Sequence, residues 1–189
     1  MLLGEMTHRI RNLFAIASSV LALSARYSQT PKDMANAVRR RLDALARAQD
    51  LTLPTLFAAE GSSDNRATLH SIVRTIVSPY DNVANLGNER VTISGPDMPI
   101  NAAAVAGLAL LLHEFATNAA KYGAFSSPAG RIDVDCRMAG DEFQVTWKEH
   151  GGPTLEGPAV REGFGSMLAR TTVQQQLQVP FFGSGIPKA

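Results

Sequence analysis

The spacing of apolar residues predicts two long helices at the start of the chain. Between Leu3 and Val20 the apolar positions recur at alternating intervals of three and four, the heptad pattern of a helix that packs against another helix. We predict that this helix covers residues 2–28 and that a second one covers residues 33–53. One side of the second helix carries Met34, Val38, Leu42 and Leu45. Because two antiparallel helices bury little surface alone, the pattern also predicts a second copy of the chain that completes a four-helix bundle, with a monomer as the alternative.

A polar stretch at residues 58–66 separates these helices from a part with a mixed pattern. There, helices are predicted at residues 68–79, 102–122 and 163–178, and strands at residues 90–94, 131–138 and 142–148, the last two as a hairpin. We therefore predict an α+β chain. It has a helical-hairpin domain at residues 1–57, a linker at residues 58–66 and an α/β domain at residues 67–189.

The composition limits the classes of protein to which the chain can belong. Its formal net charge is only +1, which argues against a protein that binds nucleic acid through bulk charge. The single cysteine, Cys136, excludes an internal disulfide framework and fits a reducing compartment. The longest apolar run, residues 102–112, is too short to span a bilayer, so we expect a soluble, cytoplasmic protein.

Polar residues at the end of the apolar helix form the first candidate site. Glu114, Asn118 and Lys121 stand at positions i, i+4 and i+7, so they share one helix face. Such a face suits a magnesium–phosphate group. The Asn118 amide oxygen would bind Mg²⁺, Glu114 would orient a metal-bound water, and Lys121 would place its charge on the phosphates. The alternative is an ordinary solvated helix end capped by Gly123.

Glycines further along the chain give a second, weaker signal. Residues 147–153 read WKEHGGP, and Gly163 and Gly165 open the last predicted helix. Glycines beside a helix N-terminus let backbone amides approach phosphate oxygens, but glycine pairs also make ordinary turns. The order of the motifs favours a nucleotide site: a polar helix end, a hairpin, an acid with glycines, and a glycine loop.

These motifs, in this order, resemble the HWE subgroup of bacterial sensor histidine kinases. The family name refers to a histidine in the N box and to Trp-x-Glu in the G1 region, which match His113 in HEFATNAAKYG and Trp147-Lys148-Glu149 here. The sequence GFGS at residues 163–166 resembles the G2 region. The resemblance implies that residues 67–189 form an α/β-sandwich ATP-binding domain of the gyrase/heat-shock-chaperone/histidine-kinase/MutL superfamily. Residues 179–189 contain two prolines and no alternating strand pair, so we expect the C-terminal sheet to be incomplete.

The resemblance also assigns roles to individual residues. Asn118 would hold Mg²⁺, with Glu114 at the acidic position of the N box, and Glu149 would accept a hydrogen bond from the adenine amino group. The remaining expected nucleotide contacts are Lys121, Tyr122, Gly151, Gly163 and Gly165. Two positions for His113 stay open, one packed beneath the site and one in contact with the ligand. Trp147 is expected in the core because of its place in the alternation of its strand.

A phosphate-accepting histidine is expected on the N-terminal hairpin, and His8 is the candidate. It lies in EMTHRIRN, residues 5–12, which resembles the H box of the family. In the heptad pattern His8 falls at the outward f position, where an imidazole can meet a phosphate. Glu5, one turn earlier, is the candidate for orienting the ring or accepting its proton. The alternative is a surface histidine without a function.

The sequence thus predicts an autophosphorylating protein-histidine kinase core that uses ATP and Mg²⁺. His8 would pass its phosphate to an aspartate of a response-regulator receiver domain, and the full-length protein is expected to carry a sensor domain upstream. Two alternatives stay open. One is a histidine phosphotransfer adaptor with a degenerate ATP-binding fold, and the other is a catalytically silent dimerisation scaffold.

Overall fold

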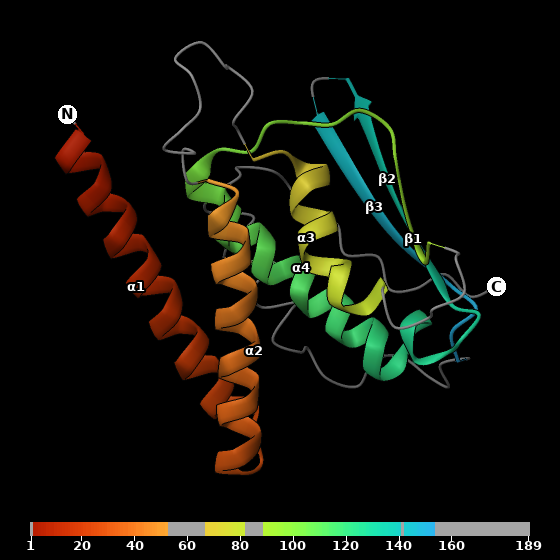
Figure 1. Ribbon diagram of the computed structural model, residues 1–189, viewed down its shortest axis with the longest axis horizontal. Coiled ribbons are helices and arrows are strands. Elements are labelled where there is room, and N and C mark those ends of the chain that lie inside the picture. Colours follow the sequence, from red (N-terminus) through yellow and green to blue (C-terminus); the bar gives the residue numbers. More distant parts are fainter. Residues whose placement is uncertain (1, 53–66, 82–88, 141, 154–189) are drawn as a thin grey trace.

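The N-terminal helices form an antiparallel hairpin, as the apolar pattern predicts (Figure 1). The structure, a computed structural model, describes residues 2–52, 67–81, 89–140 and 142–153. Helix α1 covers Leu2–Tyr27 and helix α2 covers Pro31–Asp50. Both helices end within three residues of their predicted bounds.

The turn between the two helices has clear chemical causes. The Thr30 side chain accepts a hydrogen bond from the Asp33 amide at 3.1 Å, which caps the start of α2. Pro31 takes the first position of the helix, where its missing N–H would have had no helical partner. Pro31 therefore begins α2 and does not lie in the preceding loop.

The second part of the chain alternates helices and strands. Its elements are α3 at Leu69–Asp81, β1 at Val91–Ser94, α4 at Ala102–Tyr122, the short 3-10 helix η1 at Ala124–Ser126, β2 at Arg131–Ala139 and β3 at Glu142–His150. They confirm the helices and strands expected between residues 68 and 148. The helix expected at residues 163–178 and the C-terminal segment lie outside the described residues.

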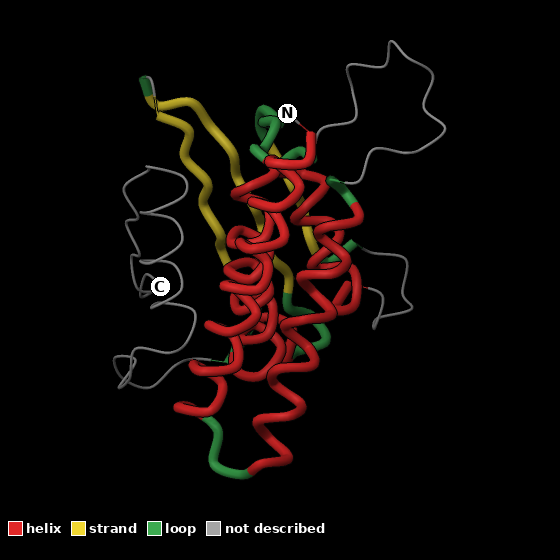
Figure 2. Tube along the Cα trace, turned by 90° about the vertical axis from the view of Figure 1, so that its left-hand side faces the viewer, coloured by secondary structure: helices red, strands yellow, loops and turns green. Residues whose placement is uncertain are grey.

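The strands form a small mixed sheet in the order β1-β2-β3. Strand β1 runs parallel to β2, with α4 in the crossover between them, and β2 pairs with β3 in antiparallel fashion. In this register Val134 lies opposite Trp147 and Ile132 lies opposite Glu149. Directly opposed residues point to the same face, and Ile132 and Val134 are buried in the core. Trp147 and Glu149 therefore lie on the core face of the sheet. Figure 2 shows the described helices on one side of the strands.

One apolar core joins the hairpin to the helices and the sheet. Ala44 and Ala48 of α2 are fully buried in the same cluster as Ile72 of α3, Val105 of α4 and Val134 of β2. Each larger side chain buried in this way stabilises the fold by about 1.5–3 kcal/mol. The hairpin thus packs against α3 and α4. The domain boundaries stay a prediction, because residues 53–66 lie outside the part that the structure describes.

The structure confirms the coarse fold class, α+β. Among the described helices only α4 is long and apolar enough to cross a membrane by length and composition, and 67% of its most apolar window is buried inside the protein. Its apolar surface therefore belongs to the core. The assignment to the ATPase superfamily and the four-helix bundle remain predictions.

The chain leaves β1 through Gly95, which we expect to tolerate no side chain. Its φ is +87°, and a Cβ atom there would lie 1.8 Å from the Cys136 carbonyl oxygen. An alanine there would have a strained left-handed backbone, and its Cβ would overlap the Cys136 carbonyl oxygen. We therefore predict that Gly95→Ala lowers the free energy of unfolding by about 2–5 kcal/mol, measured by urea denaturation.

Gly140, between β2 and β3, offers a matched control for this variant. Its φ is also positive, at +65°, but a Cβ atom would meet nothing within 4 Å. Gly140→Ala should lose only about 1–2 kcal/mol, from backbone strain alone. If both variants lost the same free energy of unfolding, the predicted overlap between a side chain at residue 95 and the Cys136 carbonyl would be contradicted.

Candidate active site

The end of helix α4 exposes three of the predicted nucleotide-binding residues. Asn118, Lys121 and Tyr122 lie on its last turns, and all three are exposed. Their side chains can therefore reach a ligand that lies beside the helix end. An exposed amide oxygen and an exposed ammonium group fit the predicted contacts with Mg²⁺ and phosphate.

Glu114, one turn earlier on α4, is buried and paired with Arg41 of α2. The Arg41 Nε and Nη2 atoms donate hydrogen bonds to the two carboxylate oxygens at 2.8 and 3.2 Å. The Nη1 atom donates to the Ser24 hydroxyl of α1 at 2.8 Å. The structure therefore separates the three residues that the helix period places on one face. The carboxylate of Glu114 faces the hairpin, whereas Asn118 and Lys121 are exposed.

Glu149 lies near the end of β3, where two N–H groups fix its carboxylate. The Ala124 amide donates a hydrogen bond to Oε2 at 2.8 Å, and the Trp147 indole donates to Oε1 at 3.2 Å. Gly123 makes room for the carboxylate, since a Cβ atom there would lie 1.9 Å from Oε2. The side chain is half-buried, and a carboxylate keeps acceptor sites after two such bonds. It can therefore receive a hydrogen-bond donor from a ligand.

The loop that supplies the Ala124 amide is fixed by a buried arginine just before β1. Arg90 is 8% exposed, and its guanidinium donates to the carbonyl oxygens of Gly130, Ala124 and Ser127 at 2.9, 3.0 and 2.6 Å. The guanidinium also lies 5.1 Å from the centre of the Phe125 ring. These contacts hold the backbone from residue 124 to residue 130 in one conformation.

The predicted glycine turns fall only in part within the described chain. Gly151 follows β3 with φ +67°, a conformation that favours glycine. A Cβ atom on Gly152 would lie 2.9 Å from the Ala124 nitrogen, so the backbone passes close to the loop after α4. The structure thus places the turn at Gly151 and Gly152 beside the loop after α4. Gly163 and Gly165 lie outside the described residues, and their role stays a prediction.

His113 takes the packed position of its two alternatives. It is 4% exposed, and its Nε2 atom lies 3.5 Å from the Thr117 hydroxyl, which contacts the Tyr80 hydroxyl at 3.2 Å. Burial, together with nearby positive charges, lowers the pKa of His113 to about 4. These charges belong to Arg41, Arg47, Arg40 and Lys121. The imidazole is therefore neutral in the folded protein near pH 7.

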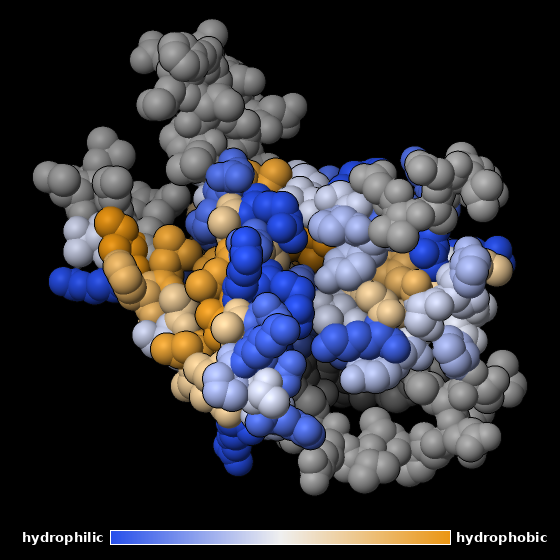
Figure 3. All heavy atoms as spheres, turned by 60° about the horizontal axis from the view of Figure 1, so that its bottom comes forward, coloured by the Kyte–Doolittle hydropathy of each residue, from blue (hydrophilic) through white to orange (hydrophobic). Residues whose placement is uncertain are grey.

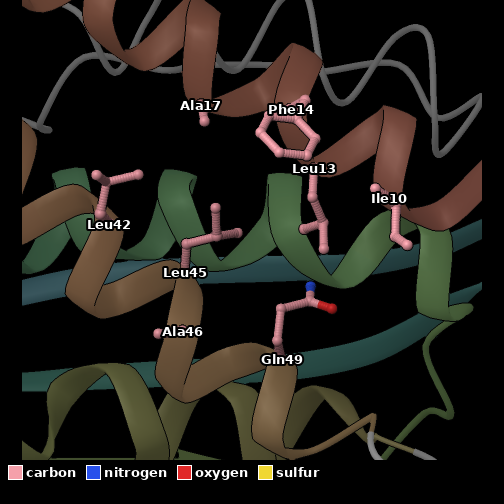
Figure 4. Close-up of a pocket in the computed structure, with 8 residues that line it drawn as sticks. All are labelled: Ile10, Leu13, Phe14, Ala17, Leu42, Leu45, Ala46 and Gln49. Carbon is pink, nitrogen blue, oxygen red and sulfur yellow. The ribbon is translucent and has the colours of Figure 1, made fainter.

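The two predicted catalytic residues of the hairpin, His8 and Glu5, lie within helix α1. Their side chains lie outside what the structure describes, so the outward position of His8 stays a prediction. Further along the helix, Ile10 and Leu13 line an apolar groove between α1 and α2 (Figure 4).

Comparison with known proteins identifies the family. A family model described as HWE histidine kinase matches residues 5–97. Blue-light-activated histidine kinase 1 of Erythrobacter litoralis is 33% identical over 167 residues, which are 87% of this chain and 44% of that protein. The blue-light-activated histidine kinase of Rhizobium johnstonii is 36% identical over 179 residues, 94% of this chain and 47% of that protein. The chain belongs to the HWE histidine kinase family.

The relatives are longer proteins. A third one, the blue-light-activated histidine kinase of Brucella ovis, is 31% identical over 191 residues, which are 96% of this chain but 37% of that protein. The chain thus spans less than half the length of the curated relatives it matches. The three residues that resemble those of the HWE name have defined places in this fold. Trp147 and Glu149 are directly hydrogen-bonded, and His113 lies in the interior of α4.

Several residues that shape the site gave no signal in the sequence. Arg41 is the last of three consecutive arginines, a pattern typical of a solvated helix face, and Arg90 belongs to no motif. Trp147 packs against the core, as expected, but its N–H was not foreseen as a donor to Glu149. The Trp-x-Glu spacing of the HWE family contains that signal, since residues i and i+2 share one face of a strand.

We expect this HWE-family chain to lose stability in mild acid because of His113. Unfolded histidine has a pKa near 6.5, so between about pH 6.5 and pH 4 the unfolded state binds a proton that the folded state does not. The free energy of unfolding should therefore fall by roughly 2 kcal/mol between pH 7 and pH 5 through this residue. Denaturation curves at the two pH values measure the loss.

Carboxyl groups also make the free energy of unfolding depend on pH, and substitution of His113 separates its contribution from theirs. His113→Gln should reduce the difference between pH 7 and pH 5 by about the same roughly 2 kcal/mol. His150→Gln, which changes an exposed histidine on β3 whose Nε2 atom lies 2.9 Å from Asp133 Oδ2, should change the difference much less, because an exposed pair contributes little to stability. A wild-type pH dependence in His113→Gln would rule out His113 as the source.

Proposed function

We propose that this chain is the kinase core of a sensor histidine kinase. It binds Mg·ATP between the end of α4 and the end of β3, phosphorylates its own His8 and passes the phosphate to an aspartate of a response-regulator receiver domain. The observation that carries the proposal is the Glu149 carboxylate, fixed by two N–H groups beside the exposed end of α4. Membership of the HWE histidine kinase family supports the reaction.

The residues at the end of α4 fit a magnesium nucleotide. Mg²⁺ keeps several waters and is usually held by one or two protein oxygens together with substrate phosphates. In this proposal the exposed amide oxygen of Asn118 is the protein ligand. Lys121 would neutralise phosphate charge, and Tyr122 would contact the nucleotide. Gly151, with Gly163 and Gly165, would let the backbone close around it.

The proposed chemistry depends on position and charge. A ring nitrogen of His8 attacks the γ-phosphorus of ATP, an N–P bond forms, the bond to the β–γ bridging oxygen breaks, and ADP leaves. Glu5 is the candidate that orients the ring or accepts its proton. Such transfers depend mainly on alignment and on neutralisation of the phosphate oxygens. In this proposal the helices and strands after residue 67 are part of an α/β-sandwich ATP-binding domain.

The hairpin surface favours a second copy of the chain as a partner. Ile10 is 46% exposed, Phe14 is 71% exposed and Leu42 is 39% exposed, and all three line the groove between α1 and α2. Figure 3 shows apolar side chains gathered on the side of the molecule where α1 lies in Figure 1. A four-helix bundle would cover this surface. We also propose that a sensor domain precedes the chain in the whole protein, as the greater length of the relatives suggests, and that the kinase acts in the cytoplasm.

Two other functions would use the same fold. A phosphotransfer adaptor would carry phosphate on His8 without using ATP, and a scaffold would only dimerise. The fixed Glu149 carboxylate and the exposed Asn118 and Lys121 favour the kinase over both, because neither alternative needs them.

Incubation with radiolabelled Mg·ATP tests the proposal. The kinase should acquire acid-labile label, and His8→Gln should abolish it, because the phosphoramidate forms on that imidazole. Asn118→Ala should reduce labelling by at least about 10-fold through loss of the magnesium ligand.

His70→Gln is the matched control, since it removes a histidine at the start of α3 that lies beside Asp97 and contacts none of the proposed nucleotide-binding residues that the structure describes, and it should leave labelling unchanged. Label that persists in His8→Gln would contradict His8 as the acceptor. Nucleotide binding without any label in the wild type would instead support the adaptor or the scaffold.

A further inference from the structure

The hydrogen bond between Trp147 and Glu149 joins two side chains that lie two residues apart on one face of β3. The indole is half-buried and packs against the apolar core. Its ring also contacts the Phe115 ring of α4, with centroids 5.7 Å apart and a tilt of 55°. The donor in the 3.2 Å bond to Oε1 is therefore itself held in place by packing.

The other carboxylate oxygen is held from a different element. Oε2 accepts from the Ala124 amide at 2.8 Å, and the Arg90 guanidinium binds the carbonyl oxygen of the same residue at 3.0 Å. One donor comes from the strand and the other from the loop after α4, so rotation of the carboxylate would break at least one bond. A glutamate without these bonds would sample many rotamers, and a ligand would have to order it on binding.

We propose that Trp147 is a positioning residue, which fixes the Glu149 carboxylate and thereby sets the preference of the site for a base with an amino group. This inference rests on the proposed nucleotide binding. A carboxylate only accepts hydrogen bonds, so in a fixed orientation it binds an amino group and repels a carbonyl group. Without the indole N–H the carboxylate turns, and the discrimination weakens while contacts with the rest of the nucleotide persist.

The sole tryptophan of the chain makes a clean test available. Trp147 is the only tryptophan in the sequence, so growth of a tryptophan auxotroph on benzothienylalanine replaces the indole N–H by sulfur and keeps the ring shape. Affinity is measured for ATP and for purine riboside triphosphate, which lacks the 6-amino group. The unmodified chain should bind ATP at least about 10-fold more tightly, since one charge-assisted hydrogen bond distinguishes the two. In the substituted chain the ratio of the two affinities should fall most of the way to one, because the affinity for ATP decreases while the affinity for purine riboside triphosphate stays unchanged.

Three variants complete the design. Trp147→Phe should lower the ratio in the same way, and Glu149→Ala should bring it close to one. Phe143 is another aromatic residue of β3, and it makes no hydrogen bond to the carboxylate in the described structure. Phe143→Leu should therefore leave the ratio of affinities unchanged.

The outcomes separate the two proposals. A substituted chain with the full ratio, or one that loses both nucleotides equally, would show that Trp147 only packs and would overturn the inference. An unmodified chain that binds ATP without the preference would overturn this inference and leave the kinase proposal standing. An unmodified chain that binds neither nucleotide would overturn both.

A second inference rests on a different observation, the guanidinium of Arg41 at the meeting point of three helices. Arg41 lies on α2, its acceptor Glu114 on α4 and its acceptor Ser24 on α1. Ser24 is 1% exposed, and its hydroxyl also donates to the Val20 carbonyl oxygen at 2.6 Å. Beside it, Val20 packs against Leu110 of α4. The pair is thus the polar centre of the contact between the hairpin and α4.

The same contact removes Glu114 from the candidate nucleotide site. Both carboxylate oxygens are occupied by one guanidinium, and the side chain is 8% exposed. Figure 1 also shows the N-terminal end of α1 on the opposite side of the molecule from the end of α4. The H-box motif at residues 5–12 lies near that N-terminal end. Within one chain this docked arrangement keeps the H-box motif and the end of α4 apart.

We infer that Arg41 is a latch that holds the hairpin docked on α4 and keeps Glu114 away from the nucleotide, an inference that also rests on the proposed kinase activity. A buried carboxylate left without its partner is strongly unfavourable, so the ion pair opens only when the hairpin moves and water reaches both groups. Opening of the hairpin and release of Glu114 are therefore one event. A signal from another domain needs only to shift this equilibrium.

Two measurements on Arg41→Gln and Arg41→Lys test the latch. Amide hydrogen exchange in α4 and α2 should be faster by about 5-fold or more, and the initial rate of His8 labelling should rise by a similar factor. Ser24→Ala should give smaller changes in the same direction. Arg39→Gln alters an exposed arginine of the same helix and should change neither quantity.

Unchanged exchange in the Arg41 variants would overturn the latch. Faster exchange with slower labelling would also overturn it, because Arg41 would then serve the active arrangement. If the wild type takes no label, the kinase proposal fails, and with it the inhibitory role of the latch. The exchange data then decide only whether Arg41 holds the hairpin docked.

Discussion

The hydrogen bonds of the Glu149 carboxylate connect the end of β3 to the loop after α4, and the candidate site depends on this connection. The helix ends at Tyr122, and the chain turns at once into η1, so nothing in the helix itself directs it toward the sheet. The Ala124 amide reaches the carboxylate because Arg90 binds three carbonyl oxygens of the loop. The carboxylate that we propose reads adenine and the helix end that we propose binds Mg²⁺ are therefore placed where they could act on one ligand.

The burial of charged side chains explains how a few polar groups fix the relative positions of the helices, the loop after α4 and the sheet. An isolated charge in an apolar interior is strongly unfavourable, so each buried ion needs a full set of partners. Arg90 finds them in backbone carbonyls, and Glu114 finds them in Arg41. In both cases the partners come from different elements. The requirement for partners thus holds the loop and the hairpin in defined positions over the apolar core.

Packing removes from His113 the proton exchange near neutral pH that is typical of histidine. A histidine near its usual pKa would exchange protons near neutral pH, but burial lowers its pKa to about 4 and leaves it neutral. Its neighbours on α4, one turn on either side, are apolar or bound to other side chains. His113 is thus a part of the interior of the fold, while Trp147 and Glu149 form a hydrogen-bonded pair at its edge.

The sequence by itself determined the secondary structure and the local chemistry of this protein. Heptad spacing predicted α1 and α2, strand alternation predicted the hairpin of β2 and β3, and the polar end of α4 marked Glu114, Asn118 and Lys121 as candidate site residues. These features depend on periodicity and on neighbours in the chain, which a single sequence displays. The tertiary structure alone decided which partners the polar groups take. Glu114 and Asn118 share a helix face in the sequence, yet only packing places Arg41 against one and leaves the other exposed. A contact between residues 73 positions apart depends on how whole elements dock, and no local pattern encodes it.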